Sequence, residues 1–178
     1  MQKLIVLHLA NSEPDTRNAT ATALSKEYKP TRIAFTSLEK KKLIRKTEIK
    51  HYKSRGSPRY WLTDEGIIAA MLVGVNPAVL LEETERLFPE RNMVHCFLEV
   101  APLMNPFVLR IAYSIVKGKG ELEFKDIATI LISQAGILME IETLEKLVAV
   151  FKKYPEEHEK LKKLIQITID QLKQLMSD

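Results

Sequence analysis

The chain has 178 residues, of which 46% are hydrophobic and 28% charged, and its formal net charge at pH 7 is +4. This composition excludes a largely disordered, collagen-like or low-complexity protein, and the length allows one or two globular domains. The positive charge lies at one end: residues 1–66 carry 14 Lys or Arg against 7 Asp or Glu, whereas residues 67–178 carry 13 against 16.

Cysteine content and apolar segments bear on location. Cys96 is the only cysteine, so an intrachain disulfide is excluded and a reducing, cytoplasmic location is expected. The longest apolar stretch, residues 67–81, is broken by Gly74 and Pro77 and is shorter than a membrane-spanning helix, which needs about 20 residues. Residues 1–10 lack the uninterrupted apolar core and the cleavage site of a signal peptide. We therefore expect a first helix there and no membrane association.

The first part of the sequence predicts three helices joined by short breaks. The apolar residues of Gln2–Ala10 predict a helix that ends before Pro14, because proline disfavours helix at the residue before it. Small residues in Asn18–Glu27 predict a second helix that packs closely against its neighbours. A third helix is expected from Pro30, which suits a first helical position, to about Lys42.

A change of pattern then predicts a β-hairpin. Residues 43–53 are rich in Ile, Thr and Tyr, residues 54–58 favour a turn, and residues 59–63 favour a returning strand. Side chains alternate across such a strand, and we expect Trp61 rather than Tyr60 to enter the core.

The rest of the chain predicts helices only. Thr63 or Asp64 can cap a helix that ends near Gly74, and Pro77 begins another that stops before Pro89. Residues 95–117 predict a short segment followed by a helix whose buried face is expected to hold Phe107, Ile111, Ser114 and Ile115. Further helices are expected within residues 121–134, 137–153 and 156–176. The predicted fold class is mainly α with a small β-hairpin.

Two segments, SLEKKKLI at residues 37–44 and YWLTDEG at residues 60–66, resemble winged helix-turn-helix transcription regulators of the MarR and PadR kind. Those families commonly show a Leu-Glu-x-x-Gly-Leu-Ile/Val turn after the recognition helix and a Leu-Thr-x-x-Gly turn after the wing. Lys42 stands where the first turn has glycine, and a left-handed backbone at that lysine would cost about 1 kcal/mol.

This resemblance implies both a domain organisation and a function. Residues 1–75 would form a winged helix-turn-helix DNA-binding domain, and residues 76–178 a helical region that dimerises and could receive an effector. The chain would be a sequence-specific transcriptional regulator that binds double-stranded DNA as a homodimer. No enzymatic activity is implied.

The third helix is expected to be the recognition helix, which buries one face and offers the other to the major groove. Thr31, Ala34, Phe35 and Leu38 recur at the spacing of one helical face and predict the buried side. Arginine and lysine can donate to guanine edges or phosphates, hydroxyl groups can serve either, and an exposed isoleucine can meet a thymine methyl group or pack on a partner or the hairpin. The expected DNA-contacting residues here are Lys29, Arg32, Ile33, Thr36, Ser37, Lys40 and Lys41.

The hairpin adds basic residues to this surface. Between Lys29 and Arg59 there are 11 Lys or Arg against 2 Asp or Glu, an excess that suits a polyanion because each neutralised phosphate releases counterions. Arg55 at the turn is placed to enter a minor groove, and Lys53 and Arg59 are expected to contact DNA beside it. A solvated charged face is the simpler alternative, and basic residues at a hairpin edge also prevent strand pairing.

The last helix carries an apolar stripe at alternating spacings of four and three, formed by Leu161, Ile165, Thr168, Leu172 and Leu175. Such a stripe must be covered by another helix. It predicts contact between two chains, with packing on Leu144, Leu147 and Phe151 of the same chain as the alternative.

Other functions have weaker support. A winged-helix fold does not by itself imply DNA binding, so a protein-interaction module in a larger assembly is the main alternative. His95 and Cys96 are adjacent and therefore make a poor pair of metal ligands. The sequence contains no phosphate-binding loop and no recognisable nucleophile arrangement, so we expect no cofactor and no metal.

Overall fold

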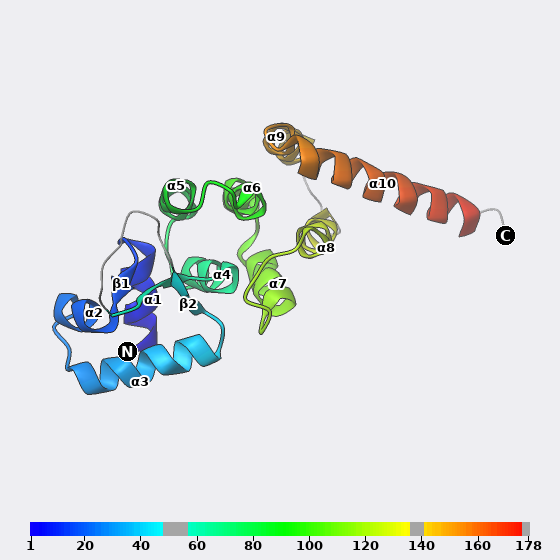
Figure 1. Ribbon diagram of the computed structural model, residues 1–178. Coiled ribbons are helices and arrows are strands. Elements are labelled where there is room, and N and C mark those ends of the chain that lie inside the picture. The colour runs from blue at the N-terminus through cyan, green and yellow to red at the C-terminus, as the bar shows by residue number, and fades with distance from the viewer. Residues whose placement is uncertain (48–56, 136–140, 176–178) are drawn as a thin grey trace.

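The computed structural model describes residues 1–47, 57–135 and 141–175. These residues form a mainly helical protein with a small antiparallel sheet beside the N-terminal helices (Figure 1). The predicted fold class is confirmed at this level. Within the described ranges, no helix combines the length and the apolar character that crossing a bilayer requires.

Three helices form the N-terminal part. Helix α1 spans Gln2–Ala10 as predicted, α2 spans Arg17–Ala23, and α3 spans Tyr28–Lys40. Helix α2 ends earlier than expected because Ser25 takes a left-handed backbone, with φ of +51°, and turns the chain toward α3. Helix α3 begins before Pro30, so this proline lies in the first turn, where its missing N–H breaks no helical hydrogen bond.

The sheet has the strand order β1-β3-β2, with β1 at Asp15–Thr16, β2 at Ile44–Thr47 and β3 at Arg59–Leu62. Strands β2 and β3 are antiparallel and pair along their whole lengths, which confirms the two predicted strands over these residues. Strand β1 pairs with the other edge of β3 and was not predicted. A strand of two residues is too short to show a sequence pattern. It forms because the free edge of β3 can pair with it.

Both faces of β3 are covered. Tyr60 packs edge-on against Phe35 of α3, with ring centroids 5.2 Å apart, and Trp61 packs against Phe88 with centroids 5.3 Å apart. Both strand residues are buried. The expectation that Trp61 rather than Tyr60 would enter the core was therefore wrong for Tyr60, because α3 covers the face that a lone hairpin would leave in water.

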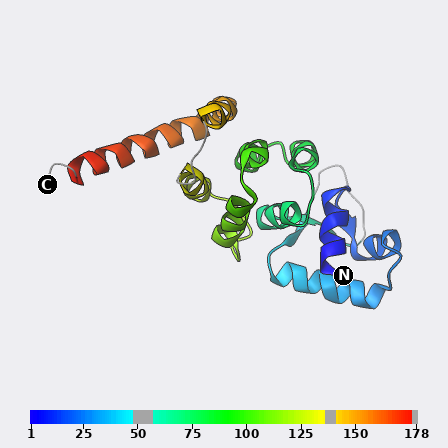
Figure 2. The ribbon, with the colours of Figure 1, turned by 180° about the vertical axis from the view of Figure 1, so that it is seen from behind.

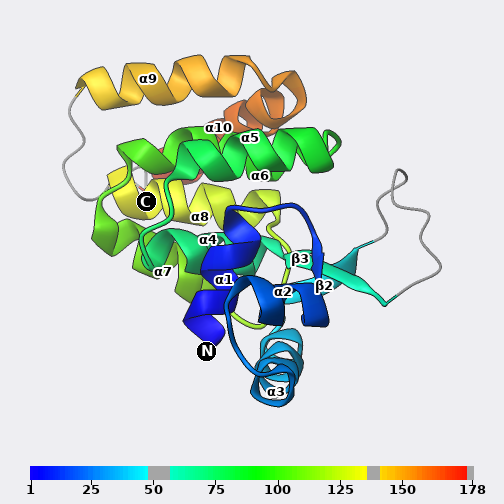
Figure 3. The same ribbon diagram turned by 90° about the vertical axis from the view of Figure 1, so that its left-hand side faces the viewer.

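Seven helices follow the sheet in the described part of the chain, and α4 is the first of them (Figure 3). They are α4 (Asp64–Leu72), α5 (Pro77–Leu87), α6 (Asn92–Val100), α7 (Pro106–Val116), α8 (Phe124–Ala135), α9 (Ile141–Lys152) and α10 (Pro155–Leu175), with a 3-10 turn at Ala101–Leu103 after α6. Helix α10 contacts α8 and α9 and then extends away from the other helices (Figures 1 and 2).

The orientation predicted for α7 was wrong. Its buried side chains are Val108, Ala112 and Val116, whereas Phe107 is 59% exposed and Ser114 is exposed. The predicted set Phe107, Ile111, Ser114 and Ile115 is a neighbouring stripe of the same helix. Because α7 is apolar on most of its circumference, periodicity allows both orientations, and the valines with the small Ala112 allow α4 and α8 to pack on it closely.

A turn at the start of α4 joins the sheet to the end of α3. The Thr63 N–H donates to the Leu43 carbonyl at 3.1 Å, and the Thr63 hydroxyl donates to the Lys42 carbonyl at 2.5 Å. The same hydroxyl accepts from the Gly66 N–H at 3.0 Å and caps α4, so Thr63 rather than Asp64 is the cap. A Cβ at position 66 would stand 1.9 Å from the Leu43 carbonyl oxygen, so only glycine fits.

Two buried carboxylates in this turn hold the loop between α7 and α8. Asp64 accepts from the Leu122 N–H at 2.7 Å, and Glu65 accepts from the Gly118 N–H at 2.8 Å. Asp64 also forms a buried ion pair with Arg91, which precedes α6. Burial lowers the pKa of Arg91 to about 10, and the guanidinium stays charged at neutral pH.

Gly66→Ala should destabilise the protein because its Cβ would displace the Leu43 carbonyl. Alanine normally favours a helix by up to about 1 kcal/mol over glycine, but here we expect the free energy of unfolding in urea to fall by roughly 2 to 4 kcal/mol.

Gly74→Ala is the control for this variant. Gly74 has a φ of +101°, but a Cβ there would meet no atom within 4 Å, so strain alone should cost about 1 to 2 kcal/mol. Equal losses for the two variants would contradict the close-contact explanation at Gly66.

Candidate nucleic-acid interface

Helix α3 packs one face against α1, α2 and β2 and leaves the other open (Figure 1). Thr31, Ala34, Phe35 and Leu38 are all buried, which confirms the inward face predicted from their spacing. The rotation of α3 about its own axis is therefore fixed by apolar periodicity, and the identity of the outward residues follows from it.

The outer face of α3 consists of Lys29, Arg32, Ile33, Thr36 and Lys40. The four polar residues are exposed, and Ile33 is 59% exposed although it is apolar. The Thr36 hydroxyl donates to the Arg32 carbonyl at 3.1 Å and keeps its oxygen lone pairs for an incoming donor. The face thus combines three cations, a hydroxyl and an apolar side chain.

Two other residues expected to contact DNA are bound by α1. The Gln2 side-chain N–H donates to the Ser37 hydroxyl at 2.9 Å, and the Lys41 ammonium donates to the Gln2 carbonyl oxygen at 3.0 Å. Ser37 is half-buried as a result, whereas Lys41 stays exposed. These contacts join residues more than 30 positions apart in the sequence, so no local pattern predicts them.

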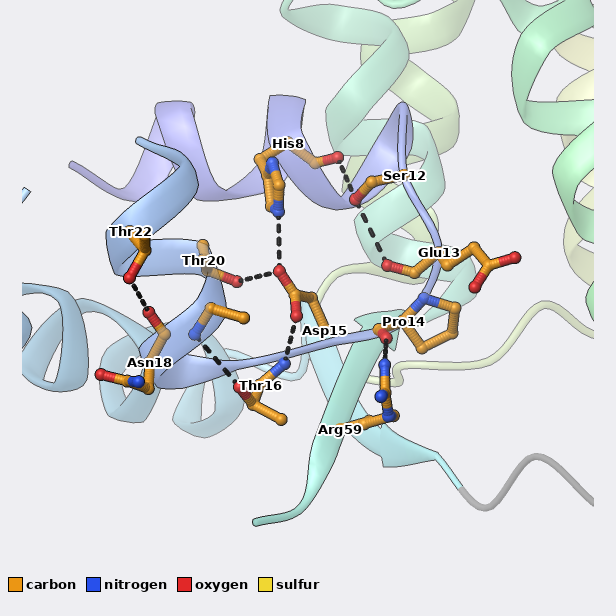
Figure 4. Close-up of polar contacts among 11 residues, drawn as sticks. His8, Ser12, Glu13, Pro14, Asp15, Thr16, Asn18, Thr20, Thr22 and Arg59 are labelled. Atoms are coloured by element: carbon orange, nitrogen blue, oxygen red, sulfur yellow. Dashed lines mark hydrogen bonds and ion pairs between the residues drawn. The ribbon is translucent and has the colours of Figure 1, made fainter. Parts of the chain in front are cut away.

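Arg59, expected in the wing, has a contact inside the fold. Its Nη1 donates to the Pro14 carbonyl at 2.8 Å and joins β3 to the segment that enters β1 (Figure 4). Arg59 is the first residue of β3, the central strand of the sheet, and it is half-buried. Lys53 and Arg55, the other two wing residues, lie outside the described residues.

A polar cluster that sequence reasoning missed fixes α2 beside α1 (Figure 4). His8 Nε2 lies 3.0 Å from an Asp15 carboxylate oxygen, and the Thr20 hydroxyl donates to the same oxygen at 3.4 Å. The other Asp15 oxygen accepts from the Thr16 N–H at 2.8 Å. Helix α1, strand β1 and helix α2 thus share one carboxylate, and α2 is the support on which α3 packs.

Arg17 fixes the angle between α2 and α3. Its guanidinium pairs with Glu39 of α3, with 3.2 Å between Nη2 and Oε2, and lies 5.0 Å from the ring centroid of Tyr60. Burial raises the pKa of the Tyr60 phenol, which stays neutral beneath the arginine. Glu39 is the one carboxylate within α3, and it is neutralised by its ion pair with Arg17.

The end of α3 has the backbone geometry that its sequence suggests. Lys42 has a φ of +57°, so it takes the left-handed conformation of the glycine that the resembling families carry there. The Leu43 N–H donates to the Leu38 carbonyl and the Lys42 N–H to the Glu39 carbonyl, both at 3.0 Å. This pair of bonds is a Schellman motif, which satisfies two terminal carbonyls and offsets the strain at Lys42.

Neither member of the His95–Cys96 pair faces solvent. Both side chains are buried in α6, burial lowers the pKa of the His95 imidazole, and burial raises the pKa of the Cys96 thiol to about 12. Across the residues that the structure describes, no group of three His, Cys, Asp or Glu side chains is arranged to hold a metal ion. The pair therefore serves as packing between α6 and its neighbours.

Comparison of the chain with protein-family models, with curated proteins and with solved structures finds no match in any of the three.

Proposed function

We propose that the protein is a sequence-specific DNA-binding transcriptional regulator with a winged helix-turn-helix in residues 1–75. Helix α2, the turn at Ser25 and helix α3 have the order of a helix-turn-helix, and strands β2 and β3 follow where a wing follows a recognition helix. The resemblance of residues 37–44 and 60–66 to MarR and PadR regulators supports the same assignment.

The outer face of α3 carries the proposal. Arg32 and Lys40 can donate to guanine edges or to phosphates, and the Thr36 hydroxyl oxygen can accept from the amino group of a base. The face combines these cations with Ile33, an apolar side chain that is 59% exposed. Ile33 there suits the methyl group of a thymine in the major groove.

Binding to duplex DNA should be tight at low salt and should weaken steeply as salt rises. If about six phosphates are neutralised, affinity should fall about a thousandfold between 50 and 200 mM salt. The measurement is selection of bound fragments from random duplexes, followed by titration at several salt concentrations. No duplex binding at low ionic strength would overturn the proposal and favour a protein-interaction module.

Arg32→Ala and Thr36→Ala should relax the preference at particular base pairs, each by roughly 1 to 3 kcal/mol, because they remove a guanidinium donor and a hydroxyl acceptor from the outer face of α3. Lys152→Ala is the control, since Lys152 is exposed on α9, away from α3 (Figure 1). The readout is the selected sequence motif of each variant. An unchanged motif for both α3 variants would show that another surface reads the bases.

Helix α10 supports a homodimer. It spans 21 residues and extends away from the other helices, and Leu161 near its start is half-buried against the core (Figure 2). Farther along, Gln166, Ile167 and Asp170 are exposed; the side chains of Ile165, Thr168, Leu172 and Leu175 lie outside the described ones. A second copy covering the stripe would present two α3 helices to half-sites about 34 Å apart.

Leu172→Lys should convert the dimer to a monomer, because it places a charge in the stripe, and should weaken DNA binding by removing the second half-site contact. Gln174→Lys adds the same charge at an exposed position of the same helix and should leave the dimer intact. Mass is measured by light scattering. A monomeric wild-type chain would exclude the dimer, and a chain cut before Pro155 that still dimerises would move the interface away from α10.

A further inference from the structure

A groove of about 340 Å³ lies beside the C-terminal end of α3, between β2 and the loop that joins α7 to α8. Its charged lining consists of the cations Lys42, Arg45, Lys46 and Lys119 and the carboxylates Glu39 and Glu121. The groove therefore combines residues from the first third of the chain with residues of the helical part. It lies just past the last residue of α3, because Lys42 follows Lys40 and Lys41 directly.

Most of these charges are already paired inside the protein. Glu39 pairs with Arg17, Lys119 pairs with Asp126 at 2.5 Å, and Arg45 pairs with Glu121 at 2.9 Å. No ion pair joins Lys42 or Lys46 to another described residue, and both side chains are exposed. The groove thus presents two available ammonium groups and one guanidinium held by a carboxylate that is itself 72% exposed.

The far wall of the groove is held rigidly. The Asp64 N–H donates to the Gly120 carbonyl at 3.0 Å, and the Gly118 N–H donates to Glu65 at 2.8 Å. Gly120 has a φ of +84°, and a Cβ there would lie 3.4 Å from the Lys42 Cβ. The buried turn at the start of α4 therefore fixes the loop against Lys42 before any ligand arrives, which lowers the entropic cost of binding.

We infer that this groove receives a backbone phosphate of the same duplex that α3 reads, an inference that rests on the proposed function. Lys42 and Lys46 contact the phosphate oxygens, and Arg45 leaves Glu121 to join them. In the protein without DNA, Arg45 is paired with Glu121. This ion pair must break before Arg45 can contact a phosphate, so Glu121 lowers the affinity for DNA. Lysine ammonium groups and arginine are the usual phosphate ligands, and contacts of this kind position a protein on the duplex without reading its sequence.

This inference predicts that removing the negative charge of Glu121 strengthens DNA binding. Glu121→Gln frees Arg45 for one more phosphate contact, so the slope of log affinity against log salt should steepen by about 0.9 and affinity at 0.1 M salt should rise about eightfold. Lys46→Ala should do the reverse by a similar factor. Neither variant should change the selected base sequence.

Glu123→Gln is the matched control. Glu123 lies two residues farther along the same loop, pairs with Lys125 and does not line the groove. The Glu123→Gln substitution changes the net charge by the same amount as Glu121→Gln and therefore measures the effect of net charge alone. It should leave the DNA affinity and the slope of log affinity against log salt nearly unchanged. Urea unfolding checks that the variants stay folded, which is expected because the Arg45–Glu121 pair is exposed.

Three outcomes separate this inference from the proposed function. If the wild-type chain does not bind duplex DNA, the proposed function fails first. If it binds with steep salt dependence but Glu121→Gln matches Glu123→Gln, only the groove assignment fails. If Glu121→Gln increases stabilisation by inorganic phosphate at constant ionic strength and leaves duplex affinity unchanged, the groove is a site for free phosphate, and the inference is overturned as well.

Discussion

The approach of α4 to the Leu43 carbonyl is the contact on which the rest of the structure depends. It lets one turn bond the end of α3, the sheet and the loop before α8 at the same time, and it exists only because Gly66 has no Cβ. The turn also buries Asp64 and Glu65, whose charges would be costly in the interior without partners. Two backbone N–H groups and Arg91 supply those partners. The buried turn therefore requires contacts from the helical part, and the same contacts hold the helical part in place.

Three arginines of the basic half hold the fold together. Arg17, Arg45 and Arg59 each reach across the fold, to a helix, a distant loop or a backbone carbonyl. Planar guanidinium groups suit such fixed, directional contacts, whereas lysine ammonium groups on flexible stems stay in solvent. Lys29 and Lys40 are exposed in this way. The charge excess between residues 29 and 59 therefore overstates the charge that a polyanion would meet, because part of it is used in holding the fold together.

Local periodicity and turn chemistry were sufficient to predict most of the helices, the paired strands and the buried face of α3, since each of these depends on neighbours within a few residues. The cap of α4 belongs to the same group, whereas the left-handed backbone at Lys42 matches a glycine position that only the resemblance to MarR and PadR regulators indicated. Helix α6, which begins at Asn92, was expected only as a short segment from His95. The rest required knowledge of distant partners. Strand β1 needs β3, the hydrogen bonds of Ser37 and Lys41 need Gln2, and the orientation of α7 was decided by packing on a helix that is apolar nearly all round. In the candidate interface, spacing identified the outer face of α3 but could not show which of its neighbours are bound within the fold.

Because Cys96 is buried, its reaction with a thiol reagent can report local opening of the helices around α6. Thiol reagents attack the thiolate, and burial raises the pKa of the Cys96 thiol to about 12, so the thiol stays protonated at pH 8 even before access is considered. The side chain is fully covered within α6, which packs against α5 and α9. Since the sequence has no other cysteine, alkylation occurs at one position only. The rate of that single reaction would record how often the helices around α6 separate, and a ligand that stabilises them would slow it.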